Sequence, residues 1–183
     1  MNEVRIIAGK FRGRAIRFPD AMDLRPTGQR VRETLFNWLA PMIHGASCWD
    51  VFAGSGALGL EAYSRGASSV LLTEANPQVC KQLQHTIAQF NAQSDIRLLA
   101  GSCWDLWDSI TGPFDVIFLD PPFECDWIAA CLTEIAQRNL LTKDGFVYAE
   151  SRKIPDINSI YWNVYRQKKA GHVLYSLFQK HQT

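Results

Sequence analysis

The chain has 183 residues, of which 47% are hydrophobic and 20% are charged, as in a soluble globular domain with a sizeable core. No apolar stretch approaches the roughly 18 residues of a membrane span, and the N-terminus does not resemble a signal peptide, so we expect a cytoplasmic protein. Its five cysteines form no C-x-x-C pair, which fits reduced thiols and argues against a zinc site.

The net charge of +1 conceals three segments of opposite sign. Residues 1–32 carry eight Lys or Arg and three Asp or Glu, and residues 151–183 carry six and one. Residues 33–150 carry five basic and fourteen acidic side chains. Basic ends around an acidic middle predict a polyanion that is held at the flanks, and an ordinary solvated surface is the competing explanation.

The N-terminal part predicts a β-hairpin followed by a helix. Stretches 4–7 and 15–18 flank a glycine-containing turn. Thr27 is a suitable N-cap for a helix with one apolar stripe that ends before Pro41. We expect residues 1–44 to form a basic extension that packs on a main domain of residues 45–183. The basic residues near the hairpin turn and the helix start are Lys10, Arg12, Arg14, Arg25, Arg30 and Arg32.

From Cys48 onward, apolar strands alternate with helical segments, a pattern typical of a parallel sheet covered by helices. After Pro155, two alternating stretches around Gly171 predict an antiparallel pair that closes the sheet. The predicted fold class is therefore α/β, with a Rossmann-like, mostly parallel sheet, an antiparallel last strand and a small N-terminal hairpin and helix. The expected strands are 48–52, 69–73, 96–100, 114–119, 145–150, 161–165 and 173–178, and the expected helices are 57–65, 76–92, 103–110 and 126–139.

A glycine turn joins the first of these strands to its helix. Gly54, Gly56 and Gly59 form a G-x-G-x-x-G, the spacing that lets the backbone approach a nucleotide and a helix pack closely on a strand. Glu74 follows Gly54 by 20 residues, the spacing at which a carboxylate meets a ribose diol. Asp50, at the end of the strand, would face a cationic group. S-adenosylmethionine has such groups in its amino acid and sulfonium, whereas a nicotinamide dinucleotide makes little use of Asp50.

A second motif, Asp120-Pro121-Pro122-Phe123, directly follows the strand expected over 114–119. Ligands of open α/β sheets lie beyond the carboxyl ends of the strands, so this loop is expected to face the glycine turn. The two prolines stiffen it. Asp120 and the Pro121 carbonyl can then accept from an exocyclic amine, while Phe123 stacks on the base.

These stretches resemble class I S-adenosylmethionine-dependent methyltransferases that act on exocyclic amino groups. Residues 5–14 and 24–39 narrow the resemblance to the RsmD family of bacterial small-subunit rRNA guanine-N2 methyltransferases, and the likeness covers nearly the whole chain. It implies a cytoplasmic enzyme that transfers a methyl group to one guanine of 16S rRNA in the small ribosomal subunit, and we expect a monomer. It assigns the base site to Asp120, Pro121, Pro122 and Phe123, and the cofactor site to Asp50, Phe52, Gly54, Ser55, Gly56, Gly59, Glu74, Ala75, Ser102 and Cys103.

Three alternatives remain open at this point. An adenine-N6 methyltransferase on DNA or RNA shares the same motifs, although two adjacent donors on guanine suit Asp120 better than adenine does. A non-catalytic rRNA-binding assembly factor could use the same fold, and the Asp-Pro-Pro-Phe motif disfavours an oxidoreductase.

Ser102 stands at a position where many members of the resembled family have Asp or Asn. We expect the six basic residues of the extension to contact phosphates, with Lys168 and Lys169 as a second anchor.

Overall fold

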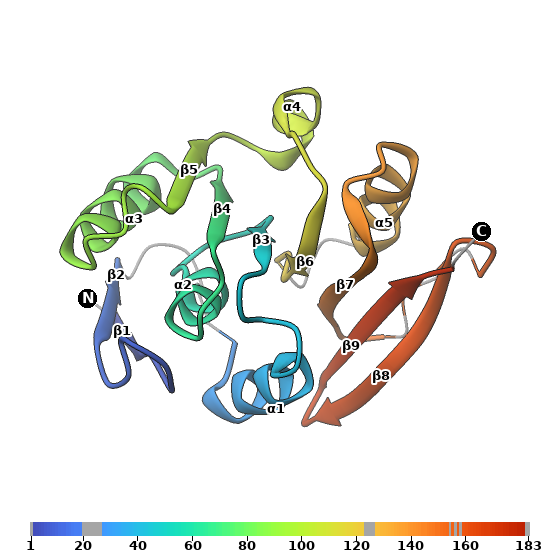
Figure 1. Ribbon diagram of the computed structural model, residues 1–183, viewed down its shortest axis with the longest axis horizontal. Coiled ribbons are helices and arrows are strands. Elements are labelled where there is room, and N and C mark those ends of the chain that lie inside the picture. The colour runs from blue at the N-terminus through green and yellow to red at the C-terminus, as the bar shows by residue number, and fades with distance from the viewer. Residues whose placement is uncertain are drawn as a thin grey trace.

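A computed structural model describes residues 2–19, 27–122, 127–153, 155, 157 and 159–181, and within these ranges a seven-stranded sheet forms the centre of the molecule (Figure 1). None of the helices in these ranges is long and apolar enough to cross a membrane. In spatial order the strands are β5 (Ile96–Ala100), β4 (Ser69–Glu74), β3 (Ser47–Asp50), β6 (Phe114–Leu119), β7 (Leu141–Ser151), β9 (Val173–Lys180) and β8 (Trp162–Ala170).

The first five strands in this order are parallel, and β9 runs antiparallel to both β7 and β8. The predicted α/β class and the antiparallel closing pair are confirmed. The edge strand β8 extends to Ala170, well beyond the expected 161–165, because its second half pairs continuously with β9.

Helices cover both faces of the sheet. Figure 1 shows α1 (Gln29–Leu39) and α2 (Ala57–Ser64) on one side, and α4 (Cys103–Leu106) and α5 (Ile128–Gln137) on the other. Neighbouring strand residues point to opposite faces, as the period of two requires. Cys48 accordingly packs with α1, α2 and α3 (Pro77–Gln89), whereas Trp49 packs with α5 and the short 3₁₀ turn η1 (Trp107–Ser109).

The N-terminal hairpin pairs β1 (Asn2–Arg5) with β2 (Ala15–Phe18), as predicted. Ile6 and Ile16 are buried in the same core cluster as α1, α2 and α3. The hairpin turn contacts the last residue of α2, because the backbone N–H of Lys10 donates to the Ser64 carbonyl at 2.8 Å. Since α2 begins at the glycine turn, the hairpin turn lies at its opposite end, about 12 Å along the helix axis. The division into residues 1–44 and 45–183 stays a prediction.

The first helix does not begin as expected. Gly28 is the N-cap residue of α1, without a side-chain capping bond, so the prediction that Thr27 caps this helix is wrong. Thr27 is 5% exposed, and its hydroxyl donates instead to Oδ2 of Asp120 at 3.0 Å. Thr27 therefore has the sequence pattern of a helix cap but makes a tertiary contact with Asp120, which follows β6 and lies 93 residues further along the chain.

A buried carboxylate joins the N-terminal segment to the sheet. Glu61 of α2 is fully buried and accepts from the backbone N–H groups of Ile7 at 2.8 Å and Ala8 at 3.1 Å. It also pairs with Arg65 at 2.7 Å and with the buried Arg32 of α1 at 3.5 Å. Glu61 is thus a structural residue of α2.

We expect Glu61→Ala to lower the free energy of unfolding by about 3–5 kcal/mol, because it leaves the Arg32 guanidinium buried without its carboxylate. Chemical denaturation measures this loss. Glu134→Ala is the matched control, since Glu134 forms an exposed i,i+4 pair with Arg138 on α5 and its loss is expected to cost about 1 kcal/mol or less. Equal losses in the two variants would contradict the structural role of Glu61.

Candidate functional site

The carboxyl ends of five parallel strands converge on one edge of the sheet, where a ligand of an open α/β sheet lies. The register places Asp50 of β3 beside Leu72 of β4 and Phe118 of β6. Glu74 pairs with Ala100 at the end of β5. The glycine turn and the Asp120 loop therefore share this edge, as expected from the sequence.

The glycine turn is fixed by Glu74. One oxygen of this carboxylate accepts from the Gly54 backbone N–H at 2.9 Å, and the other accepts from the Asn76 N–H at 2.7 Å. Gly54 and Gly56 have φ values of 50° and 79°, in the left-handed region that favours glycine. Each carboxylate oxygen keeps a second lone pair, so Glu74 retains acceptor capacity for two ligand hydroxyls.

Asp50 is buried with one oxygen unpartnered. Its Oδ2 accepts from the Gly59 N–H at 3.0 Å, whereas its Oδ1 has no hydrogen-bond partner among the described residues. Burial raises the pKa of Asp50 to about 7, and the Glu74 carboxylate adds to this rise. An unsatisfied buried oxygen of this kind is costly unless a ligand donates to it. A cationic amino group is a suitable donor.

Three residues of the predicted cofactor site have structural contacts within the protein. Gly59 lies in α2, where a Cβ atom would come within 2.5 Å of Leu72 Cδ2, so this glycine serves close helix–strand packing. Ser102 is the N-cap of α4 and accepts from the Trp104 N–H at 3.3 Å. The Cys103 side chain is buried in the core cluster that contains α5. Gly59 and Cys103 are therefore held by packing, and their assignment to the cofactor site stays a prediction.

Asp120 directly follows β6, and its Oδ2 accepts from the Thr27 hydroxyl at 3.0 Å. Its pKa is raised well above the ordinary value, mainly by desolvation and next by the Glu150 carboxylate, while the Thr27 hydroxyl opposes the rise. Its neighbours Pro121 and Pro122 are described, whereas Phe123 lies outside the described residues. Whether Phe123 stacks on a base stays a prediction.

Sequence reasoning missed Thr27 and Glu150 as members of this site. Glu150, near the end of β7, is 3% exposed and accepts from the Tyr148 hydroxyl at 2.9 Å. Residues 146–149 form a continuous apolar run, which fits a buried strand, and a carboxylate directly after this run was the available signal. Thr27 offered no such signal, because its spacing fitted a helix cap.

Aromatic side chains line the α4 and α5 side of the same edge. The Phe52 ring stacks on Trp127 with centroids 5.8 Å apart, and Trp127 meets Trp104 edge-on at 5.7 Å. Trp104 is 38% exposed, whereas Trp107 is buried against Trp49. This arrangement places Trp107 in the core and leaves Phe52 and Trp104 at its rim.

The predicted phosphate contacts do not form one surface. Arg32 is 1% exposed and donates to the carbonyls of Thr27 and Arg5, so its assignment as a phosphate contact is wrong. Arg25 lies outside the described residues. Arg30 is exposed in the first turn of α1, at the Asp120 edge of the sheet.

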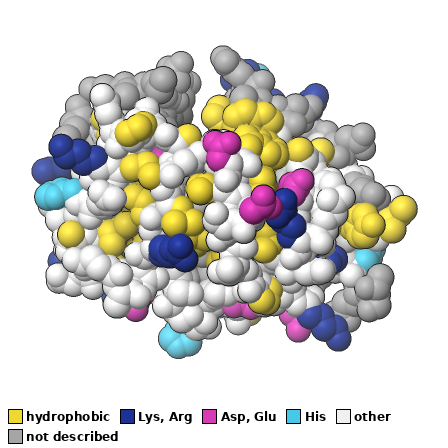
Figure 2. All heavy atoms as spheres, turned by 90° about the horizontal axis from the view of Figure 1, so that it is seen from above, with side chains coloured by type: hydrophobic (Ala, Val, Ile, Leu, Met, Phe, Trp, Pro, Cys, Tyr) yellow, Lys and Arg dark blue, Asp and Glu magenta, His cyan; other side chains and the backbone are white. Residues whose placement is uncertain are grey.

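The hairpin turn carries the other three basic residues at the opposite edge. Lys10 Nζ lies 3.5 Å from the Tyr63 ring centroid, and the Arg14 guanidinium lies 5.3 Å from that of Phe90. Arg12 is exposed on the same turn. Figure 2 looks onto the α4 and α5 face, where the basic side chains drawn in colour are scattered and do not form a continuous field.

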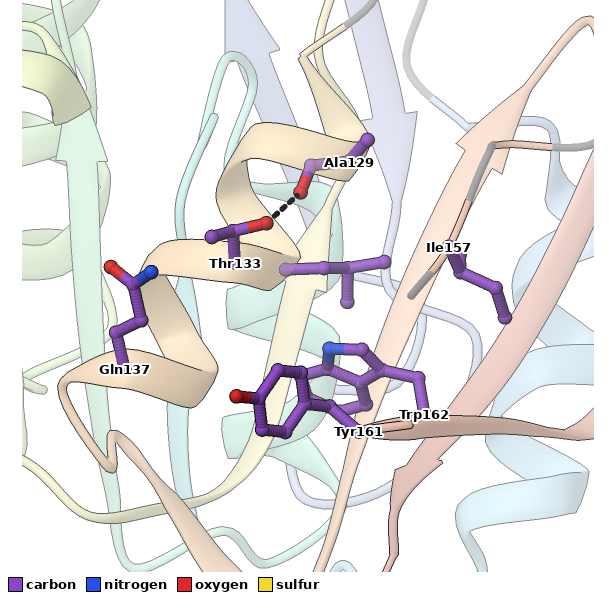
Figure 3. Close-up of a pocket in the computed structure, with 7 residues that line it drawn as sticks. Ala129, Thr133, Gln137, Ile157, Tyr161 and Trp162 are labelled. Atoms are coloured by element: carbon purple, nitrogen blue, oxygen red, sulfur yellow. Dashed lines mark hydrogen bonds between the residues drawn. The ribbon is translucent and has the colours of Figure 1, made fainter. Parts of the chain in front are cut away.

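A cavity of about 430 Å³ lies away from this edge, between α5 and the start of β8 (Figure 3). Figure 3 shows Tyr161 and Trp162 facing Thr133 and Gln137 across it. Its described lining contains no carboxylate, histidine or cysteine. It therefore lacks the titratable groups of the strand-end site.

We expect Asp50→Asn to change the pH dependence of stability in the absence of ligands. The pKa of Asp50 lies at about 7 in the folded chain and near 4 in the unfolded chain, so the wild type loses stability as the pH rises from about 4 to 7. The amide avoids this loss. The unfolding free energy of the variant, relative to that of wild type, is therefore expected to rise across this window in denaturation series.

Asp95→Asn provides the control of opposite sign. Hydrogen bonds from Tyr63 and Ser94 lower the pKa of Asp95, so its stabilising contribution is present above about pH 4 and is lost as the pH falls further. Its variant should approach wild type at low pH. A difference between Asp50→Asn and wild type that is independent of pH would contradict the burial of Asp50 as an ionisable group.

Comparisons with known proteins identify relatives of this chain. The family model described as "Conserved hypothetical protein 95" matches residues 4–179. The chain is 39% identical to "Ribosomal RNA small subunit methyltransferase D" of Escherichia coli strain K12 over 97% of this chain and 90% of that protein, and 40% identical to the protein of the same name from Haemophilus influenzae over 97% and 94%. The solved structure of the Escherichia coli yhhF protein superposes with a TM-score of 0.90 at 38% identity, and all of both chains is covered. The resemblance predicted from the sequence is confirmed, and the chain belongs to the ribosomal RNA small subunit methyltransferase D family.

Proposed function

We propose that this protein transfers a methyl group from S-adenosylmethionine to the exocyclic N2 of a guanine in the 16S rRNA of the small ribosomal subunit. The observation that carries this proposal is the shared sheet edge, where the buried Asp50, Glu74 at the glycine turn and Asp120 lie within one parallel register. The family relatives named as small-subunit rRNA methyltransferases support the substrate class.

The cofactor fits the donors and acceptors at the glycine turn. Asp50 Oδ1 is buried and unpartnered among the described residues, so the amino group of the methionine moiety can donate to it. The remaining lone pairs of Glu74 suit the two ribose hydroxyls. Bound there, S-adenosylmethionine supplies an electrophilic methyl group on a sulfonium. The chain's own part is to orient that group toward the Asp120 loop.

The target base would be held by Asp120 and Pro121. Guanine presents two adjacent N–H donors, N1 and N2, and a carboxylate accepts from both. The N2 lone pair is delocalised into the ring, so acceptors on the amine hydrogens favour a pyramidal nitrogen that can attack the methyl carbon. The N–C bond forms as the C–S bond breaks, and the amine proton leaves toward the carboxylate. A base inside an RNA helix must first leave the stack.

Labelled methyl transfer tests the function. Wild-type protein, S-adenosylmethionine and undermethylated small subunits are expected to yield labelled N2-methylguanosine after nucleoside analysis. Asp120→Asn should lower the transfer rate at least about tenfold, because a hydrogen bond to a charged acceptor is lost, while calorimetric affinity for the cofactor stays nearly unchanged. Labelled N6-methyladenosine would reverse the base assignment, and binding of subunits without any transfer would indicate an assembly factor.

A separate binding measurement tests the cofactor site. Glu74→Ala should weaken S-adenosylmethionine binding roughly 5- to 150-fold, which corresponds to the loss of about 1–3 kcal/mol from hydrogen bonds to a charged group. Glu134→Ala, on the exposed surface of α5, should bind it as wild type does. Equal affinity in all three proteins would overturn the assignment of Glu74.

The position of the basic residues predicts a dependence on substrate size. Arg30 lies at the Asp120 edge, so Arg30→Glu should raise the KM for both a short stem-loop and whole subunits. The turn residues lie at the far edge, so the triple change of Lys10, Arg12 and Arg14 to Glu should impair only the large substrate. Each lost phosphate contact should reduce the salt slope of binding by about 0.7 on single strands or about 0.9 on a duplex.

Arg97→Glu is the matched control for these charge reversals. Arg97 is exposed on β5, outside the predicted RNA surface, and its reversal changes the net charge of the chain equally. An equal loss for Arg97→Glu and Arg30→Glu would indicate a general charge effect and not a phosphate contact at α1.

A further inference from the structure

The start of α1 touches Asp120 through a single buried side chain. Thr27 is 5% exposed, and its hydroxyl donates to Asp120 Oδ2 at 3.0 Å. Oδ1 of the same carboxylate accepts no hydrogen bond from the described residues. The hydroxyl therefore distinguishes the two oxygens of Asp120: one is held by the protein, and the other is left for a ligand.

A second carboxylate lies next to Asp120 on the neighbouring strand. Leu119 of β6 pairs with Ala149 of β7, so Asp120 and Glu150 follow at the same level of the sheet. Glu150 is 3% exposed, and the Tyr148 hydroxyl holds its Oε1 at 2.9 Å. A fixed, buried carboxylate at this place acts directly on the ionisation of Asp120.

The groups that face this pair come from several elements. Asp50 of β3 and Glu150 of β7 disfavour ionisation of Asp120, and Thr27 beside α1 favours it. Burial raises the pKa of Tyr148, and the carboxylates of Glu150 and Asp120 and the nearby Tyr175 of β9 raise it further. Burial raises the pKa of Glu150, and the hydroxyls of Thr27 and Tyr148 oppose this rise. Glu150 and Thr27 thus act on Asp120 with opposite signs.

We propose that Thr27 and Glu150 are positioning residues for Asp120: Thr27 orients its carboxylate and favours its ionised form, and Glu150 opposes ionisation until cationic and N–H donor groups occupy the site. This inference rests on the proposed function. No proton donor beyond the site is required, because Asp120 gives its proton to solvent when the site fills and takes up the amine proton that the transfer releases.

The chemistry of the two substrates explains why the ionisation of Asp120, and therefore its contact with Thr27, would matter. A base that donates two N–H groups binds best to an ionised carboxylate. The sulfonium of the cofactor adds positive charge nearby, which lowers the cost of ionising Asp120 beside Glu150 and Asp50. Full ionisation of Asp120 would then coincide with the presence of both substrates.

Two substitutions should shift the pH–rate profile in opposite directions, and this difference tests the proposal. Thr27→Val removes the hydroxyl at nearly constant volume, so the acid limb of kcat, at saturating cofactor and subunits, should move to higher pH. Glu150→Gln removes the neighbouring charge, so the limb should move to lower pH. When the limb moves by about one pH unit, the rate at a fixed pH on the acid side changes about tenfold. Thr27→Ser keeps the donor and should restore the wild-type limb.

Controls separate positioning from folding and from the function itself. Thr86→Val makes the same change at a buried threonine of α3, whose hydroxyl donates to the Gln82 carbonyl, and should leave the limb in place. Thr86→Val should also leave the cofactor affinity unchanged. If the wild type is active, two results would overturn the positioning roles. One is an acid limb of kcat that does not move in Thr27→Val or Glu150→Gln, and the other is a loss of kcat that is equal at all pH values. An inactive wild type would instead overturn the proposed function.

Discussion

The buried carboxylate of Glu61 is the interaction on which the rest of the arrangement depends. It binds the chain just after β1 through two backbone N–H groups and binds α1 through Arg32. Arg32 in turn donates to the Thr27 carbonyl at 3.2 Å. A buried ion pair of this kind is poor evidence of net stability, because desolvation opposes the Coulomb attraction. Its effect here is geometric, since it fixes where α1 begins and therefore where Thr27 meets Asp120.

The site concentrates negative charge at one sheet edge. Asp50, Asp120 and Glu150 are all held where burial raises their pKa values, and two of them raise that of Asp120 further. Such an arrangement is unfavourable in an isolated chain and favourable around a ligand with a sulfonium and an ammonium group. The same charge repels phosphates, so basic residues around the site would have to hold an RNA. The acidic middle and basic ends of the sequence follow this division.

The strands, their mostly parallel arrangement and the antiparallel closing pair could be predicted because the strand and helix periods alternate clearly from Cys48 onward. What could not be predicted depends on tertiary contacts. Thr27 has the local pattern of a cap, yet a hydroxyl near a helix start is equally able to donate to a distant carboxylate. Arg32 has the sequence pattern of an exposed basic residue, but it is buried because it pairs with the buried Glu61 of α2. Glu150 gave only the signal of a charge in a buried strand.

The N-terminal segment connects the two ends of the molecule. Its hairpin turn is anchored at the end of α2 and its helix begins at Asp120, so one continuous segment spans the height of the sheet. An RNA that binds both Arg30 and the hairpin turn would extend along this side of the protein, past α2, and not across the α4 and α5 face. Because Glu61 and Ser64 of α2 hold the segment at its middle and at its turn, both groups of basic residues are fixed relative to the base site. A large, folded RNA is therefore a better match to this surface than a short single strand.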